Sequence, residues 1–346
     1  MKKISALVLF ALACNLAFAQ TDENRKAAFH FSFISPVGTN GLHSAKTTNV
    51  ASLNLLVGVS KNEQAFTLGG LSNVILNDAT GVQIAGLSNY VGNKGAGFQL
   101  AGLVNINKGS FSGFQVGGLF NSAGNVNGVQ IAGLVNTAKD IQGLQFAGLV
   151  NTAADVKGVQ IGGLVNIAKD VKGVQFAGLI NIAENSDVPI GLINIIKNGE
   201  MSIAATYDAI GSTVLSFRSG GKYTYGILGM GYNHKAGGNG LVVEAGLGAH
   251  IPVLSWFRIN NELKVSAIEA SGSKNSIFNY GYSLLPAFRI GRHIELFGGA
   301  SINYMQFDGT TNNTSIFPKH SLWNKSSSTR LQHVYIGYQV GVQFIF

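Results

Sequence analysis

A short repeat fills the middle of the chain and limits what the chain can fold into. Seven clear copies resemble GVQIAGLVN and begin at Gly81, Gly97, Gly113, Gly128, Gly143, Gly158 and Gly173. They are 15 residues apart, with two 16-residue exceptions. A degenerate copy starts at Ala65 and a truncated one at Pro189. Such regularity indicates that each copy is one structural unit, which buries its faces against its neighbours.

Each copy alternates as a β-strand does. In the copy at Gly128, Val129 and Ile131 share an apolar face, whereas Gln130 and Asn136 share a small, polar one. The polar face repeats one glutamine and one asparagine: Gln83, Asn89, Gln99, Asn105, Gln115, Asn121, Gln130, Asn136, Gln145, Asn151, Gln160, Asn166, Gln175 and Asn181. These positions would line a lumen or stack as a ladder, in either case a structural role.

The first interpretation is a membrane barrel. The apolar face would contact lipid along a tilted strand, and the polar face would line the lumen. If neighbouring strands are antiparallel, a repeat of 15 residues joined by hairpin loops with an even number of residues keeps equivalent positions on the same face of the sheet. Two N-terminal strands, nine from the array and seven after it predict an all-β transmembrane antiparallel β-barrel of about 18 strands. This count treats Met201–Phe217 as one bent strand.

The alternative is a β-solenoid repeat array attached to a smaller C-terminal barrel. The glutamines and asparagines would then stack between coils as ladders. The repeats carry almost no Tyr or Trp for an interfacial belt, and their turns do not alternate in length, which favours this reading. The apolar outer stripe opposes it, because that stripe would face water on an isolated solenoid.

The two ends of the chain predict export. Lys2 and Lys3 precede an apolar core at Ile4–Leu16 and an Ala-Phe-Ala site, which is typical of a cleaved signal peptide. The last segment, Leu331–Phe346, alternates and ends on an aromatic residue. It resembles the closing strand of bacterial outer-membrane barrels, which implies that Phe346 is the C-terminal assembly signal.

The predicted organisation has four parts: a signal peptide (1–19), N-terminal barrel strands (20–64), the 15-residue repeat array (65–198) and C-terminal barrel strands (199–346). If the C-terminus is periplasmic, the long polar connection Gly309–Arg330 lies outside the cell, as do the stretches near His234–Asn239 and Ser271–Ile277. Nine aromatic residues would form interfacial girdles: Tyr223, Tyr225, Tyr232, Trp256, Phe257, Tyr280, Tyr282, Tyr304 and Tyr335.

Composition excludes several classes of protein. Only 12% of the residues are charged and 46% are hydrophobic, which argues against intrinsic disorder. One cysteine cannot form a disulfide or zinc framework. The net charge is +8, but the basic residues form no Lys/Arg run, so no nucleic-acid partner is expected. Basic loop residues would instead meet lipopolysaccharide phosphates.

Candidate chemistry is sparse. The seven histidines show no metal-ligand spacing, and the two nearby pairs worth considering are His320 with Ser321 and His293 with Glu295. Neither pair has a visible orienting partner, so we predict no catalytic, metal or cofactor-binding residues, no cofactor and no enzymatic activity.

The chain resembles the Leptospira-type surface-repeat outer-membrane proteins. The resemblance rests on the GVQIAGLVN-type units, on FISPVGTNG (33–41), SLNLLVGVS (52–60) and SFRSGGKYTYGILGMGYN (216–233). It implies an outer-membrane or surface location in a Gram-negative bacterium and supplies no catalytic residues. The expected function is a non-enzymatic barrel scaffold that could act as a passive pore, or a surface adhesin or interaction protein that presents a solenoid. The expected partners are outer-membrane lipids, lipopolysaccharide and the barrel-assembly machinery.

Overall fold

The computed structural model describes residues 25–236, 240–269, 275–308, 316–318, 320–327 and 330–346. The predicted signal peptide lies outside these residues. The chain divides into two compact units, Met1–Ala153 and Ala154–Phe346. Within the described residues, no helix is long and apolar enough to cross a membrane.

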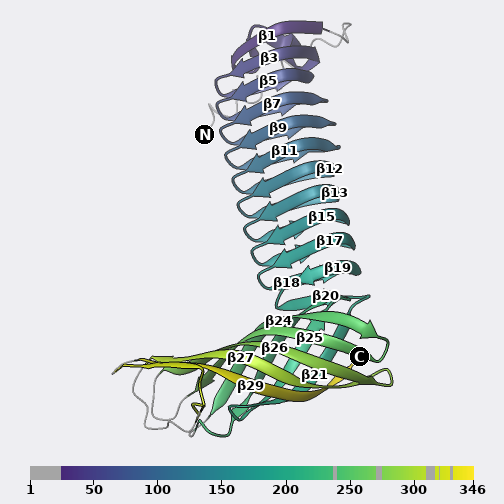
Figure 1. Ribbon diagram of the computed structural model, residues 1–346. Helices are drawn as coiled ribbons and strands as arrows, with labels where there is room; N and C mark the ends of the chain where they lie inside the picture. The colour runs from purple at the N-terminus through teal and green to yellow at the C-terminus, as the bar shows by residue number, and fades with distance from the viewer. Residues whose placement is uncertain (1–24, 237–239, 270–274, 309–315, 319, 328–329) are drawn as a thin grey trace, which may run out of the picture. The chain divides into compact units, whose positions relative to one another are not determined.

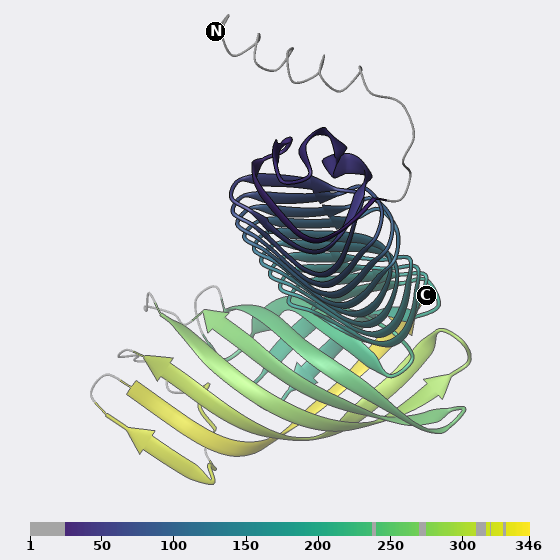
Figure 2. The same cartoon turned by 90° about the horizontal axis from the view of Figure 1, so that it is seen from above.

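The first unit is a stack of β-coils (Figure 1; Figure 2 views the coils from above). Each repeat supplies two short strands, such as β7 (Ala79–Ala85) and β8 (Ser88–Val91). The remaining elements of this unit are β1 (Arg25–Ile34), β2 (Val37–Gly38), η1 (Gly41–Lys46), β3 (Thr47–Asn54), β4 (Val57–Ser60), β5 (Asn62–Gly69), β6 (Ser72–Ile75), β9 (Gly95–Ala101), β10 (Val104–Asn107), β11 (Phe111–Gly117), β12 (Phe120–Ala132), β13 (Val135–Ala147) and β14 (Val150–Thr152). Parallel pairing places Gln83 opposite Gln99, so equivalent positions stack.

The predicted 18-stranded barrel is therefore wrong, and the alternative of a solenoid with a smaller barrel fits the structure. Two glycines per repeat explain the difference. Gly128 has a φ of 140°, and a Cβ there would lie 2.1 Å from the carbonyl oxygen of Gly113. A Cβ on Gly133 would lie 2.1 Å from the oxygen of Gly118. These glycines permit bends and close stacking of coils that a straight barrel strand does not need.

The N-terminal segment belongs to the same stack. Residues 20–64 were predicted as barrel strands, but β1 pairs in parallel with β3, and His30 lies opposite Ser52. β3 in turn pairs in parallel with β5, and Ser52 lies opposite Thr67. The described part of this segment therefore forms the first coils, because its alternation continues that of the repeats.

The second unit contains further coils and a closed antiparallel barrel. Its coil strands are β15 (Asp155–Gly162), β16 (Val165–Ile167), β17 (Asp170–Ala177), β18 (Ile180–Ala183), β19 (Asn185–Ile190) and β20 (Ile193–Ile196). The barrel strands are β21 (Glu200–Asp208), β22 (Ser212–Gly220), β23 (Thr224–Asn233), β24 (Leu241–Leu254), β25 (Phe257–Glu269), β26 (Ser276–Ile290), β27 (Ile294–Asp308) and β29 (Arg330–Ile345). Pairing of β21 with β29 closes the barrel, and β28 (Trp323–Ser326) pairs with the start of β29.

Strand prediction in this tail was accurate with one exception. Met201–Phe217 is two strands, β21 and β22, rather than one bent strand. The Asp208 carboxylate accepts hydrogen bonds from the backbone N–H groups of Ile210 and Ser212, and Gly211 has a φ of 84°. This tight turn brings the barrel to eight strands, which is just wide enough for side chains to fill its interior.

The barrel is apolar outside, whereas its interior holds buried polar side chains together with two apolar clusters, the larger of which includes Val242, Ile268 and Phe307. Along β29, Ile336, Val340 and Phe344 are exposed, whereas Gln339 and Gln343 are buried. Most of the aromatic residues predicted for girdles lie outside or are half-buried: Tyr223, Tyr232, Trp256, Phe257, Tyr280, Tyr282 and Tyr304. Tyr225 and Tyr335 are the exceptions, because both are buried in the interior.

The chain enters and leaves the barrel at the same end. The backbone N–H of Phe346 donates to the carbonyl of Met201, beside the start of β21. The short connections at Ser255–Trp256 and 291–293 lie at this end, which we call the terminal end. The long connection between Asp308 and Arg330 leaves from the opposite end.

Candidate functional site

The repeated asparagines form a buried amide ladder. Asn121 Nδ2 donates to Asn136 Oδ1 at 3.0 Å, and Asn136 Nδ2 donates to Asn151 Oδ1 at the same distance. Asn136 Nδ2 also lies 2.7 Å from the carbonyl oxygen of Phe146 on the next coil. In the second unit the pattern runs from Asn181 to Asn194. The side-chain amide of Asn136 thus joins neighbouring coils by two hydrogen bonds, one to the next asparagine side chain and one to a backbone carbonyl of the next coil.

The repeated glutamines form a second ladder in the opposite sense. Gln130 Nε2 donates to Gln115 Oε1 at 2.8 Å, and Gln145 Nε2 donates to Gln130 Oε1 at 2.9 Å. Their amides therefore donate towards the N-terminus, whereas the asparagines donate towards the C-terminus. All fourteen predicted positions are completely buried. They hold coils together and line no lumen.

The strongest cluster of charges lies inside the barrel. Arg218 of β22 makes a 2.8 Å ion pair with Glu262 of β25. Lys264 Nζ lies 3.1 Å from Glu244 and 3.7 Å from Glu262. The Tyr225 hydroxyl also donates to Glu262 at 2.9 Å. These contacts connect four neighbouring strands across the lumen.

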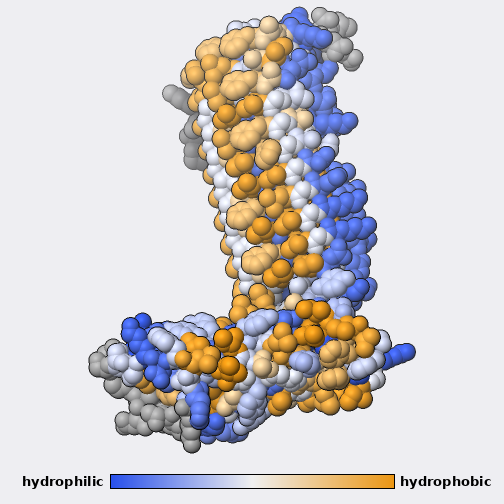
Figure 3. All heavy atoms as spheres, in the orientation of Figure 1, coloured by the Kyte–Doolittle hydropathy of each residue, from blue (hydrophilic) through white to orange (hydrophobic). Residues whose placement is uncertain are grey.

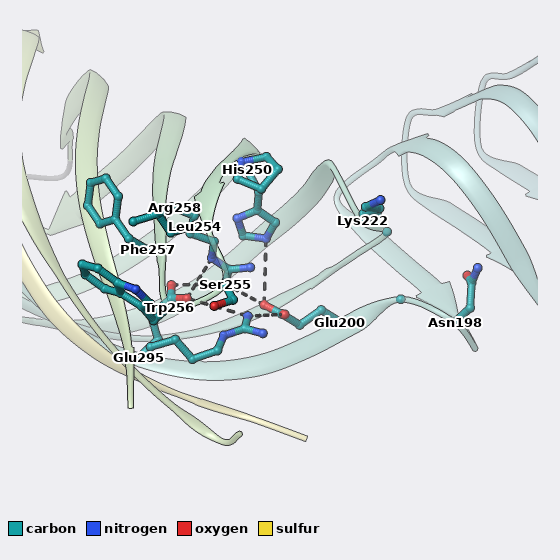
Figure 4. Close-up of a pocket in the computed structure, with 14 residues that line it drawn as sticks. Asn198, Glu200, Lys222, His250, Leu254, Ser255, Trp256, Phe257, Arg258 and Glu295 are labelled. Atoms are coloured by element: carbon teal, nitrogen blue, oxygen red, sulfur yellow. Dashed lines mark hydrogen bonds and ion pairs between the residues drawn. The ribbon is translucent and has the colours of Figure 1, made fainter. Parts of the chain in front are cut away.

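A second group of charges lies at the terminal end (Figure 4). Arg258 bridges Glu200 at 2.6 Å and Glu295 at 2.8 Å. Arg289 lies 2.6 Å from the other Glu200 oxygen. Gln343 Nε2 donates to Glu295 at 2.8 Å, which ties the last strand to the group.

We call these two groups together the lumen network. Its members are Glu200, Glu244, Glu262, Glu295, Arg218, Arg258, Lys264 and Arg289. Four carboxylates and four cations cancel in formal charge, and each carboxylate lies within ion-pair distance of a cation. Buried charges persist only when paired in this way. The network stabilises the barrel interior, and each of its four carboxylates has a cationic partner.

Strand alternation explains how the sequence builds this network. In β25, Asn260, Glu262 and Lys264 are two residues apart and point inward, whereas Leu263 between them is exposed. The sequence interpretation missed the network. The available signal was that Arg258, Glu262 and Lys264 of β25 all fall on the same face of the strand, with mostly apolar residues on the other.

A cavity of about 430 Å³ opens beside the charges at the terminal end (Figure 4). Glu200, His250 and Arg258 form its polar side, and Trp256 and Leu254 contribute apolar surface. His250 Nδ1 lies 2.7 Å from Asn260 Oδ1, and its ring stacks on Tyr225 at 4.3 Å. The charged groups Glu200, Arg258, Arg289 and Glu295 of this cavity are thus paired with one another.

The two histidine pairs considered from the sequence are not formed as pairs. His293 Nδ1 lies 2.9 Å from the Ile345 carbonyl and its ring stacks on Phe344, whereas Glu295 joins the lumen network. Ser321 Oγ lies 3.3 Å from His333 Nδ1, and His320 is exposed. Within the described residues, no group of three or more His, Cys, Asp or Glu side chains could hold a metal ion.

Comparison with known proteins gives little further identification. No family model and no curated protein match the chain. Among solved structures, a de novo designed transmembrane β-barrel is 13% identical, covering 42% of this chain and 93% of its own, with a TM-score of 0.25. Neisserial surface protein A is 16% identical, covering 42% of this chain and 94% of its own, with a TM-score of 0.24.

Proposed function

We propose that this chain is a non-enzymatic outer-membrane protein whose barrel anchors the β-solenoid on the periplasmic side. One observation carries the proposal: an eight-stranded closed barrel exposes apolar side chains and keeps its charges paired inside. A closed barrel leaves no unpaired strand edge, which is the condition for crossing lipid with strands. The predicted signal peptide supports export to that membrane.

Connectivity favours the periplasmic side for the solenoid. In single-chain bacterial barrels short turns are periplasmic and long loops are extracellular. Here the chain passes from β20 to β21 at the terminal end, where Phe346 and the short connections also lie. The coils therefore precede the barrel on the periplasmic side. The alternative function, a surface adhesin that presents a solenoid, is therefore disfavoured. The solenoid is present, but a periplasmic solenoid would not be displayed on the cell surface.

The lumen network favours an anchor over a passive pore. Eight strands form an interior that side chains can fill, and Arg218, Glu262 and Lys264 lie buried within it. A hydrated ion could pass through the barrel only if these buried ion pairs separated, and separating buried charges costs several kcal/mol. We therefore infer that the barrel conducts no ions in its native state.

Ion flux into proteoliposomes tests this inference. Insertion is measured on the same sample by the heat-dependent shift of the folded band on a gel. We expect fully inserted protein to give the flux of protein-free liposomes. Flux that rises in proportion to the inserted protein would contradict the closed anchor and restore the passive pore.

Two partner predictions belong to this proposal. Phe346 is exposed directly after the end of β29, where the barrel-assembly machinery could bind it as the assembly signal. Lys325 and Arg330 are exposed at the end opposite the termini. Their positive charge suits the phosphates of lipopolysaccharide.

A further inference from the structure

The repeat coils have an inverted distribution of polarity. Gln130 and Asn136 have 0% exposure, whereas Leu134 is 41% exposed and Phe146 is 45% exposed. Water-soluble proteins bury apolar side chains and expose polar ones, and large exposed apolar patches mark interaction sites. The surroundings of these coils are therefore themselves expected to be apolar.

The apolar surface is concentrated around one edge of each coil. The leucine after the second glycine of each repeat marks this edge, which we call the leucine edge: Leu71, Leu87, Leu103, Leu119, Leu134, Leu149, Leu164 and Leu179. Outward residues on the two flanking strands, such as Ile131 and Val135, extend it to both sides. The apolar surface is thus convex and wraps around an edge.

The opposite edge of the coils is charged. Its exposed members, which we call the charged edge, are Lys94, Lys108, Lys139, Asp155, Lys157, Lys169, Lys172, Glu184 and Asp187. Figure 3 shows the two surfaces as separate orange and blue regions along the coils. Each coil is therefore amphipathic across its width.

The backbone at the leucine edge needs no water. Leu134 N donates to Leu119 O at 3.0 Å, and Val135 N donates to the same oxygen at 3.0 Å. Leu149 N in turn donates to Leu134 O at 3.0 Å. Bonds between coils thus satisfy these groups even where the chain bends. This matters because an unsatisfied backbone group in hydrocarbon costs several kcal/mol.

We propose that the coils lie in the plane of the outer membrane, with the leucine edge among the acyl chains of the periplasmic leaflet. The charged edge then lies at the lipid headgroups, where lysine side chains extend towards water and phosphate. This inference rests on the proposed function, which brings the coils and the membrane together in one chain. A convex apolar edge favours fluid acyl chains over a second copy, which would require a flat matching face.

The test uses single cysteines carrying an environment-sensitive fluorophore, in the mature chain reconstituted into liposomes. Leu134→Cys and Leu149→Cys report on the leucine edge, and Lys139→Cys and Lys157→Cys on the charged edge. Leu263→Cys, on the exposed outer wall of the barrel, reports insertion of the barrel itself. Lipids brominated in their acyl chains quench a fluorophore only where it contacts hydrocarbon.

We expect brominated lipids to reduce fluorescence at positions 134, 149 and 263 about twofold or more, and to leave positions 139 and 157 unchanged. Quenching at 263 without quenching at 134 and 149 would overturn the inference while sparing the anchor. If brominated lipids also fail to quench the fluorophore at position 263, the barrel is not inserted and the proposed function is overturned. If 134 and 149 instead self-quench at high protein density and ignore brominated lipid, a second copy covers the edge and the inference is wrong.

Discussion

At the scale of single residues, the glycines of the repeat decide between the two folds considered. Antiparallel hairpins and parallel coils both place equivalent residues of neighbouring repeats side by side, so the 15-residue period fits either. Gly128 separates them, because its positive φ and its approach to Gly113 belong to a stacked coil. A φ value cannot be read from the letter G, and sequence alone therefore left both folds open.

Gly128→Ala should destabilise the coils by about 1–3 kcal/mol, because its Cβ meets the Gly113 carbonyl at 2.1 Å and its φ is strained. Ser122→Ala, at a half-buried outward position, is the matched control and should change stability by less than about 0.5 kcal/mol. Hydrogen exchange of β11–β13 measures both. Equal exchange in the two variants would contradict the stacked-coil geometry.

The buried carboxyl of Glu63 should make the stability of the first coils depend on pH. Burial raises the pKa of this carboxyl, against the lowering effect of hydrogen bonds from Asn49 at 2.9 Å and Ser52 at 2.7 Å. The folded state thus binds the proton more tightly than the unfolded state. Its stabilising contribution is complete below the ordinary pKa and is lost as pH rises through the raised folded pKa.

Glu63→Gln should remove this dependence, because the amide keeps the carbonyl acceptor and has no charge to bury. Hydrogen exchange of β3, β5 and β7, corrected for the intrinsic rate at each pH, should show opening becoming easier with rising pH in the wild type only. The same pH slope in both proteins would show that another group is responsible.

At the scale of elements, strand alternation made most of the barrel predictable. The predicted tail segments Lys222–Asn233, Gly240–Leu254, Phe257–Ala270, Phe278–Ile290, Ile294–Asp308 and Leu331–Phe346 each match one strand of the barrel, since each alternates between outward apolar and inward residues. The turn between β21 and β22 was missed because the Asp208 side chain bonds that form it lie inside an apparently continuous alternation. The lumen network was missed because its members are spread over residues 200–295 and meet only after the sheet closes.

Removing one partner of the lumen network should weaken the barrel. Arg218→Met removes the 2.8 Å partner of Glu262 and leaves only the Lys264 cation at 3.7 Å, and breaking a buried pair costs up to about 3–5 kcal/mol. Adding Glu262→Leu should recover most of this loss, since no unpaired carboxylate then remains. The temperature at which the folded band converts on a gel reports barrel stability.

Arg330→Met is the control for this experiment. Arg330 pairs with Asp308 in water, where ion pairs contribute little, so its loss should not move the conversion temperature measurably. Equal conversion temperatures for Arg218→Met and Arg330→Met would contradict the stabilising role of the lumen network.

At the scale of the whole molecule, composition predicts the surroundings of the chain but does not predict where its polar residues lie. Low charge and abundant apolar residues predicted surroundings other than water, whereas the sequence left open whether the repeated Gln and Asn line a lumen or form a ladder. The structure places them in ladders between coils and places charged residues in the lumen. The combination proposed here, a closed barrel that anchors coils on the periplasmic side, follows from connectivity that no local pattern reveals.

Cysteine labelling in intact cells tests this topology most directly. Lys169→Cys lies on the exposed charged edge of the coils, and Lys325→Cys is exposed at the barrel end opposite the termini. With a membrane-impermeant maleimide, we predict that Lys325→Cys is labelled in intact cells and that Lys169→Cys is labelled only after the outer membrane is permeabilised. Equal labelling of Lys169→Cys before and after permeabilisation would place the coils on the cell surface and contradict the account.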